Sequence, residues 1–482
     1  MAPPSRPLAG QPSGGVAARD GESSQRPHGT GHPAAAARSR RDLPAVSGHQ
    51  DALDGIRAIA AFAVLVIHVG GETGYAFTGT PASWVVSRGD IGVPIFFTLS
   101  GLLLFRPWAR AVLQGGQAPK AGPYLWRRAL RILPVYWAVV LIALPTLNAA
   151  HAGASWTWAQ YLFLLQVYDP HPWWPGTGAR GLAQMWSLSI EVSFYLALPL
   201  IAAALGWLAR RAGPDVDLRA KRLLAGITGL AASSYAFIVL TFYPSKQFWL
   251  GATLPRLTTW FAAGMAIAVV TVWAQAEPGR DGPVRRFCRT VGFSAGACWL
   301  IAALVFAIAC TPIAGPEAIA IPDVWSTEMK TALYTVVAGV VVASVAFQPS
   351  GPTRLTRLMG NRIMRFLGKT SYGMFLWQFL IIFAFFNFIH LKDTFHGGTY
   401  STIEVIGILI AVGLLTIGVS AVGYVCIERP AQRLYRLVGA PSRGTAAAAA
   451  QRAAAERAAT QRAASPGAAM ARQDGGGPPG LA

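Results

Sequence analysis

Charged residues are scarce in this sequence, and acidic residues are scarcer than basic ones. Only 13% of its 482 residues are charged, with 21 Asp and Glu against 41 Lys and Arg, whereas 53% are hydrophobic. So low a charge content at this length excludes a soluble protein of ordinary composition. The mean hydropathy of +0.41 and the repeated apolar runs predict an all-α, polytopic membrane protein.

Cysteine is also rare. The sequence has four, at positions 288, 298, 310 and 426, and no CxxC pair. This pattern argues against a disulfide framework and against a thiolate metal site, so we expect no metal. The formal net charge is +20, but the Lys and Arg residues lie between apolar runs and form no soluble basic face. Their placement favours loops facing an anionic inner membrane surface and argues against a nucleic-acid partner.

The two ends of the chain lack hydrophobic periodicity. Residues 1–50 are rich in Pro, Gly, Ser, Ala and Arg and lack the apolar core of a signal peptide. We expect an uncleaved, disordered cytoplasmic tail there. Residues 438–482 are predicted to form a low-complexity cytoplasmic tail. The sequence therefore predicts one transmembrane domain over residues 51–437.

Ten apolar runs divide this domain, most of them near the roughly 20 residues needed to span hydrocarbon. They are Leu53–Gly71, Ile91–Trp108, Leu130–Asn148, Met185–Leu208, Leu223–Phe242, Leu254–Ala274, Gly292–Thr311, Glu328–Phe347, Thr370–Leu391 and Thr402–Cys426. The aromatic segment Trp156–Tyr168 is too short to span, and we interpret it as interfacial or re-entrant.

The basic residues alternate between the two sides of these runs. Tails and loops assigned to one side hold 34 Lys and Arg, and the alternate loops with their run ends hold 6. Cytoplasmic loops carry such an excess of positive charge. The split predicts ten transmembrane helices with both termini in the cytoplasm.

The first run contains two polar residues, Arg57 and His68, that an ordinary membrane helix would lack. Eleven positions at about 100° each bring both side chains to one helix face, roughly 16 Å apart along the axis. Their cost in lipid predicts that this face lines a site, with Asp54 as a further candidate. The alternative is a buried histidine that only bridges helices.

A basic segment precedes the third run and contains Arg127, Arg128 and Arg131. Guanidiniums bind phosphates in bidentate fashion, so this cluster is a candidate phosphate site at the inner surface. A stop-transfer anchor explains the same charges equally well.

Polar residues also mark three later runs. Glu191 enters apolar surroundings near the outer end of the fourth run, after Trp186, and needs a cationic or donor partner or a structural hydrogen bond. Ser100, next to Gly101, interrupts an apolar run, and Ser371 and Tyr372 lie in FLGKTSYGMFLWQF. At the end of the last run, the simplest interpretation of IERP is a local ion pair of its Glu and Arg, with the proline ending the helix.

Six motifs in this order resemble the acyltransferase family 3 of membrane O-acyltransferases: LDGIRAIAAFAVLVIH, GVPIFFTLSGLLLF, RRALRILP, WSLSIEVSFY, LGKTSYGMFLW and IERP. The resemblance covers residue 53 to about residue 437. It implies a ten-helix plasma-membrane enzyme that passes an acyl group, usually acetyl from cytoplasmic acyl-CoA, to a hydroxyl. The implied acceptor is a sugar, glycolipid, cell-envelope glycan or macrolide-type natural product.

By this resemblance Arg57 and His68 are the matching motif pair, and Arg128 and Arg131 match the basic motif. Glu191 matches the first acid of a motif that usually has two. Two positions depart from the family pattern, because Val192 replaces the second glutamate and Gln378 replaces a histidine. We also expect no hydrolase-like domain after the last helix, unlike the fused members of the family.

O-acyl transfer needs a base, oxyanion donors and a cationic cradle for the CoA phosphates. We assign these roles to His68 as base, with Glu191 orienting it or binding the acceptor, and to the arginines as the cradle. A covalent acyl-histidine relay remains open, whereas the serines lack a nucleophile-elbow context. The rival interpretations are a proton-coupled secondary transporter, for which internal repeats are missing, and a non-catalytic membrane scaffold.

Overall fold

The computed structural model describes residues 43–44, 50–277, 281–316, 322–349, 353–393 and 400–437. Within these residues the regular structure is helical, and the β contact present is an isolated bridge between Pro44 and Pro349. The two predicted tails lie almost entirely outside the described residues.

Within the described chain, nine segments are long and apolar enough to cross a membrane. Their main helices are α2 (Asp51–Glu72), α4 (Gly92–Leu113), α5 (Ala121–Leu147), α7 (Met185–Arg210), α8 (Val216–Phe242), α9 (Leu254–Ala276), α12 (Val324–Ala346), α14 (Arg362–Phe388) and α15 (Thr402–Gly423). Each coincides with one of the predicted runs. The all-α membrane architecture is therefore confirmed.

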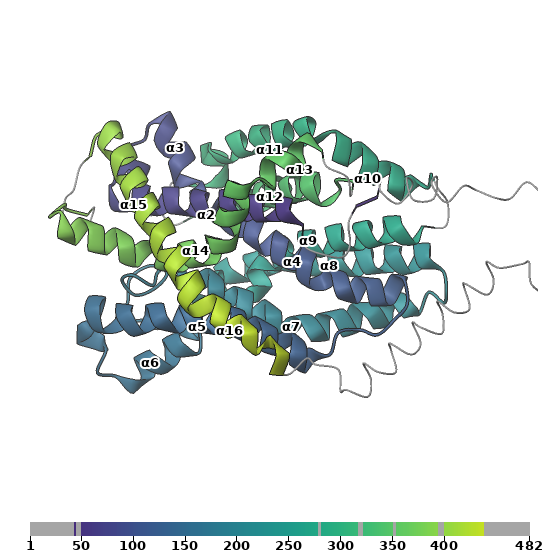
Figure 1. The fold of residues 1–482 in the computed structure, drawn as a ribbon, viewed down its shortest axis with the longest axis horizontal. Helices are drawn as coiled ribbons and strands as arrows, with labels where there is room; N and C mark the ends of the chain where they lie inside the picture. Colours follow the sequence, from purple (N-terminus) through teal and green to yellow (C-terminus); the bar gives the residue numbers. More distant parts are fainter. Residues whose placement is uncertain are drawn as a thin grey trace, which may run out of the picture.

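The seventh predicted run differs from a simple span. It consists of α10 (Pro283–Phe293) and α11 (Ala295–Ala309), which meet at 73°. Three arginines on α10 make it a basic amphipathic segment, so only the apolar α11 suits hydrocarbon. With 15 residues α11 is about 22 Å long, shorter than the roughly 30 Å hydrocarbon layer. The described chain has ten spans if this bent pair counts as one, and Figure 1 shows the pair beside α12.

Short helices complete the bundle. They are α3 (Pro81–Ser87), α6 (Ser155–Leu162), α13 (Arg354–Met359) and α16 (Arg429–Arg433), with 3-10 turns that include η2 (Gly89–Ile91), η4 (Gln166–Tyr168) and η6 (Pro312–Ala314). The segment 156–168 thus forms α6 and η4, neither long enough to span, as predicted.

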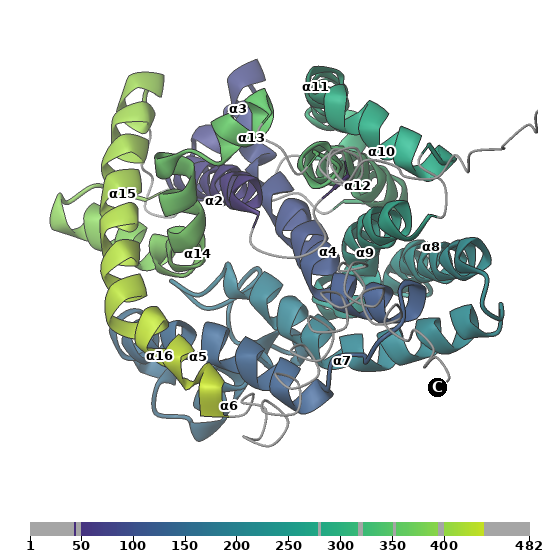
Figure 2. The ribbon, with the colours of Figure 1, turned by 45° about the vertical axis from the view of Figure 1, so that its right-hand side comes forward.

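Helix α2 lies at the centre of the bundle. It packs against α14 and α4, α4 packs against α9 and α9 against α8, while α15 covers α14. Figure 2 shows α5 and α7 on the other side of the space between α14 and α4. Five helices therefore surround one interior region.

The α4–α9 contact explains a motif that the sequence leaves ambiguous. Helix α4 is continuous through Ser100 and Gly101, so no break occurs there. A Cβ on Gly101 would lie 2.1 Å from the carbonyl oxygen of Phe261, and one on Gly264 would lie 1.9 Å from that of Thr98. Only glycine permits this backbone approach, which fixes the rotation of α4 and hence the direction of Ser100.

The last span ends differently from the simplest sequence interpretation. Residues Tyr424–Glu428 form a π-helical turn, and α16 then continues past Pro430. Glu428 is buried and accepts a hydrogen bond from Gln432 at 2.9 Å. The ion pairs of the described residues include none between Glu428 and Arg429, because the π turn directs this carboxylate into the protein.

Candidate active site

A cavity of about 310 Å³ lies between α2, α4, α5, α7 and α14. It brings together side chains that are up to more than 300 residues apart in the sequence. Its polar lining comprises Arg57, Ser100, Arg128, Arg131, Ser187, Glu191, Tyr195, Ser371 and Tyr372, and its apolar lining includes Phe96, Phe97 and Phe375. Seven of the predicted site residues therefore meet at one cavity.

Arg57 is held in the cavity wall by its own helix. Its Nη1 donates to Oδ1 of Asp54 at 3.0 Å, and the Asp54 side chain is only 3% exposed. A Cβ on Gly368 would lie 2.2 Å from the carbonyl oxygen of Asp54, so α14 presses directly on this turn of α2. Asp54 thus orients Arg57 without itself lining the cavity.

The predicted arginine cluster divides into two parts. Arg128 and Arg131 are three residues apart, share a face of α5 and line the cavity. Arg127 is exposed and does not line it, because one residue rotates the side chain by about 100°. The Nε of Arg128 is buried and has no hydrogen-bond partner in the described structure, which leaves it free for an anionic group.

Glu191 is bound by two hydroxyl groups. Its Oε1 accepts from Ser100 at 2.5 Å and from Tyr195 at 2.6 Å. These partners come from α4 and from the next turn of α7. The hydrogen bonds found for Glu191 in the described residues do not involve His68, so the expected orienting contact is not formed here.

The other three candidates differ in position. Ser371 donates to Gly368 O at 2.8 Å and Tyr372 donates to Ile132 O at 2.8 Å, and both residues line the cavity. The Tyr372 contact ties α14 to α5 across one wall. Trp186 packs half-buried against the hydrophobic core and does not line the cavity.

His68 is not among the residues that line the cavity. Its ring stacks on Phe379, the residue after Gln378, with 4.2 Å between the ring centroids. Phe375 lines the cavity and Gln378 lies three residues further along α14, about 4.5 Å by helical rise. Phe375 in the cavity lining is also about one helical turn from Phe379, the residue that stacks on the imidazole.

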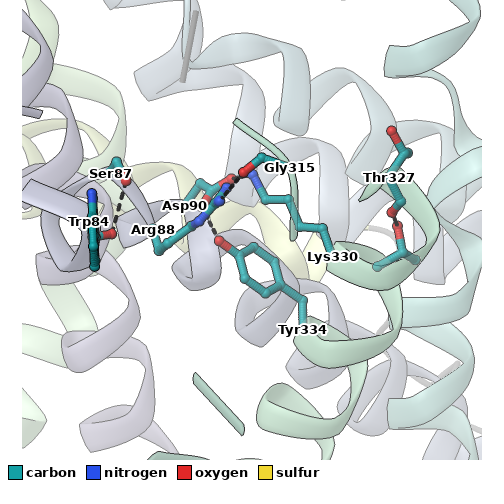
Figure 3. Close-up of polar contacts among 9 residues, drawn as sticks. Trp84, Ser87, Arg88, Asp90, Gly315, Thr327, Lys330 and Tyr334 are labelled. Carbon is teal, nitrogen blue, oxygen red and sulfur yellow. Dashed lines mark hydrogen bonds and ion pairs between the residues drawn. The ribbon is translucent and has the colours of Figure 1, made fainter. Parts of the chain in front are cut away.

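A second polar cluster lies where residues 88–90 meet α12 (Figure 3). Asp90 accepts from Lys330 at 2.6 Å and from Tyr334 at 2.5 Å, and Arg88 donates to Gly315 O at 2.5 Å. These contacts join the start of α4 to α12 and to the η6 segment.

The two departures from the family pattern face different regions. Val192 lines a groove on α7 together with Leu164 and Leu196, separate from the cavity. A second glutamate there would not enter the cavity as this helix is oriented. Gln378, by contrast, is buried and directly precedes Phe379, which stacks on His68.

Sequence reasoning missed two neighbours of the arginines. Glu428 and Tyr435 both interact electrostatically with Arg131. Burial raises the pKa of Tyr435, with Arg131 and Arg128 opposing that rise. Its phenol therefore stays neutral near pH 7 and can donate a hydrogen bond near Arg131. The π turn at Tyr424–Glu428, which local sequence does not reveal, brings Glu428 there.

This arrangement defines a class of protein: a polytopic membrane protein with a cationic and hydroxyl-lined cavity inside its helix bundle and a histidine beyond it. Among the described residues, no cluster of three or more His, Cys, Asp or Glu side chains could hold a metal ion. The chain belongs to a family of acyltransferases, since the family model described as "Acyltransferase domain" matches residues 50–425.

Three relatives are similar to this chain. A provisionally named O-acetyltransferase of Staphylococcus aureus (strain COL) is 22% identical over 349 residues, which are 70% of this chain and 51% of the relative. Peptidoglycan O-acetyltransferase OatA of Listeria monocytogenes serovar 1/2a is 22% identical over 370 residues, 71% of this chain and 50% of the relative. Nodulation protein 10 of Rhizobium leguminosarum bv. viciae is 26% identical over 273 residues, 47% of this chain and 71% of the relative.

The chain therefore spans about half the length of the first two of these relatives. No solved structure matches it.

Proposed function

We propose that this protein is a plasma-membrane O-acyltransferase that moves an acyl group, most simply acetyl, from cytoplasmic acyl-CoA to a hydroxyl group. One observation carries the proposal. Arg128 and Arg131 line a cavity that Phe375 also lines, and Phe379, one turn further along α14, stacks on His68. An anion site and a nearby histidine, inside an acyltransferase domain, are parts that acyl transfer from CoA requires.

The donor binds with its phosphates at the arginine end. Arg128 has an unpaired buried Nε, and guanidiniums bind phosphate oxygens through two parallel hydrogen bonds. Arg57 is already paired with Asp54. It therefore contributes mainly positive charge at the cavity wall and fewer free hydrogen-bond donors. The apolar rings of Phe96, Phe97 and Phe375 line the remainder of the cavity, where an uncharged pantetheine arm fits better than a phosphate.

His68 acts as the general base. A neutral imidazole takes the proton of the acceptor hydroxyl, and the resulting oxygen nucleophile attacks the thioester carbonyl. The tetrahedral intermediate collapses with cleavage of the carbon–sulfur bond, and the proton passes from the imidazolium to the leaving thiolate. Because His68 does not line the cavity, the acyl group must pass through the cavity wall to reach it.

For the acceptor we propose a chemical class and not one compound. The name of the Listeria relative specifies peptidoglycan, and a glycan or glycolipid hydroxyl is the acceptor class that we propose here. A macrolide-type product is the second acceptor class that we propose.

The proposed function is tested by label transfer. Membranes with the native chain, His68→Ala or His151→Ala at matched protein levels receive radiolabelled acetyl-CoA, and base-labile label is counted in lipid and glycan extracts. His151 is the matched control, because it is an exposed histidine stacked on Trp173. We expect label with the native chain and His151→Ala and a loss of at least about 100-fold with His68→Ala.

Equal label with His68→Ala would exclude His68 as the base and direct attention to Glu191. No label above chain-free membranes would contradict acyl-CoA as donor and favour the transporter or scaffold interpretation.

A further inference from the structure

Tyr124 on α5 has a buried hydroxyl group without a partner. The residue is 5% exposed, and its Oη makes no hydrogen bond within the described part of the chain. Leaving a buried hydroxyl unpaired costs free energy, and the hydroxyl of a buried tyrosine usually finds a partner. An unpaired phenol here therefore indicates that another molecule completes it.

Two helices place Tyr124 just past the cavity. It lies four residues before Arg128, which lines the cavity, and residues four apart on a helix are neighbours on one face. On α4, Trp108 lies four residues after Leu104, which also lines the cavity. The rings of Trp108 and Tyr124 meet edge to face with 5.0 Å between their centroids. The two rings therefore lie at the same end of the cavity, about one helical turn past its lining.

The phenol continues the stripe of hydrogen-bond donors on α5. The Nε of Arg128 is also buried and without a partner in the described residues. Long side chains on a helix lie over the turn that precedes them, so the Arg128 side chain extends toward the turn of Tyr124. Arg131, seven residues after Tyr124, lies on the same face and lines the cavity. A hydroxyl and two guanidiniums in one stripe are suited to an anion, which can accept from all of them.

The size of the cavity gives a second reason to look past its lining. Its volume of about 310 Å³ is at the lower end of ligand pockets, which span roughly 300–1,000 Å³. Acyl-CoA carries a nucleotide and its phosphate groups in addition to the pantetheine arm. Such a donor extends beyond the cavity, and the turn that carries Tyr124 is where the hydrogen-bond donors of α5 continue.

We propose that the hydroxyl of Tyr124 donates a hydrogen bond to a phosphate oxygen of the acyl donor, beside Arg128, so that the phosphate site extends about one helical turn beyond the cavity. This inference rests on the proposed function for its choice of ligand. The edge-to-face contact with Trp108 holds the ring in place. The phosphate completes two buried groups, the phenol and the Arg128 Nε, that the protein leaves unpaired.

The same substitution at two tyrosines of α5 tests this role. Tyr124→Phe removes the hydroxyl and keeps the ring. Tyr136→Phe is the matched control, because Tyr136 is 0% exposed, does not line the cavity, and donates its hydroxyl hydrogen bond to the carbonyl oxygen of Tyr161. The two variants remove an unpaired and a paired buried hydroxyl from one helix.

Binding of coenzyme A to the purified chain in detergent, measured by titration calorimetry, is the primary readout. We expect Tyr124→Phe to raise Kd for coenzyme A by roughly 10-fold, because it removes a hydrogen bond to a charged group. The kcat for acetyl transfer should change little, since the phosphates are remote from the reacting carbonyl. Tyr136→Phe should leave Kd unchanged.

The two variants should also differ in stability without ligand. Tyr124→Phe should unfold at the same temperature as the native chain or at a higher one, because an unpaired buried hydroxyl is lost. Tyr136→Phe should unfold at a lower temperature, because the carbonyl of Tyr161 loses its partner. A titration with 3′-dephospho-CoA identifies the phosphate: the loss of affinity in Tyr124→Phe persists if the diphosphate is bound and disappears if the 3′-phosphate is bound.

Equal Kd values for coenzyme A in the native chain and Tyr124→Phe would overturn this inference and leave acyl transfer standing. A lower unfolding temperature of ligand-free Tyr124→Phe would overturn it as well, because the hydroxyl would then be bonded within the protein. Weakened binding in Tyr124→Phe, in a chain whose native form transfers no acetyl group, would retain the contact and reject the transfer. A native chain that binds no coenzyme A would contradict both.

Discussion

Each guanidinium of the cavity has a different amount of free hydrogen-bonding capacity. Arg57 is paired with Asp54, whereas Arg128 keeps a buried Nε without a partner and Arg131 lines the same cavity. Unpaired polar groups in a low-dielectric site are costly, so such groups indicate a ligand that completes them. Arg128 and Arg131 are therefore the residues that we expect to bind the donor.

Replacing Arg131 with glutamine tests this assignment. The variant loses a charge-assisted contact of about 1.5–3 kcal/mol, which corresponds to an increase in KM for acetyl-CoA of roughly 10- to 100-fold. The expected change in kcat is small, because the phosphates are remote from the reacting carbonyl. Initial rates against acetyl-CoA concentration measure both constants.

Arg110→Gln is the control, since Arg110 is an exposed arginine near the end of α4. The assignment fails if Arg131→Gln and Arg110→Gln give the same KM as the native chain.

The sequence predicts which residues of this site are charged, but the rotation of each helix determines which of them face the cavity. Arg57, Arg128, Arg131 and Glu191 stand out because charge inside an apolar run demands a partner, and all four line the cavity. Arg127 shows the limit of a motif, which gives the residue type but not the direction of the side chain. The contact between Glu191 and Ser100 spans 91 positions and has no local signal.

At the scale of helices, the position of Arg57 depends on how closely α2 approaches α14. Gly368 permits this approach, because any Cβ there would collide with the Asp54 backbone. Two neighbouring glycine contacts, at Gly101 and Gly264, similarly set α4 against α9. The cavity is thus shaped by backbone contacts outside its own lining.

The Gly368→Ala variant tests the α2–α14 contact. Overpacking at such a contact costs about 1–3 kcal/mol, so we expect a lower thermal midpoint in detergent and reduced transfer activity. Gly418→Ala on α15 is the matched control, because nothing lies within 4 Å of a Cβ there. Equal midpoints for both variants would show that the close contact contributes nothing to stability.

Helix boundaries show where sequence and structure diverge. Nine predicted runs correspond to spans. Each has about 20 mostly apolar residues, which is the length that the thickness of the bilayer requires of a spanning helix. The α10–α11 bend and the π turn before α16 arise from packing and charge at helix ends, which hydropathy does not encode.

For the whole molecule, the distribution of Lys and Arg predicts that the arginine end of the cavity faces the cytoplasm. Cysteines introduced at Gln117 and Gly153, two exposed positions at opposite ends of α5, test this orientation in a chain without Cys310 and Cys426. An impermeant maleimide should label Gly153→Cys in intact cells and Gln117→Cys only after permeabilisation. The reverse pattern would place the donor site outside and would contradict a cytoplasmic donor.

The central claim is that the cavity delivers an acyl group from cytoplasmic acyl-CoA to a hydroxyl through His68. It is tested most directly in sealed inside-out vesicles that receive radiolabelled acetyl-CoA on the cytoplasmic face alone. We predict base-labile label in a membrane-derived product with the native chain, little with Arg131→Gln at low donor concentration, and none with His68→Ala. Undiminished label with His68→Ala, or none with the native chain, would contradict this account.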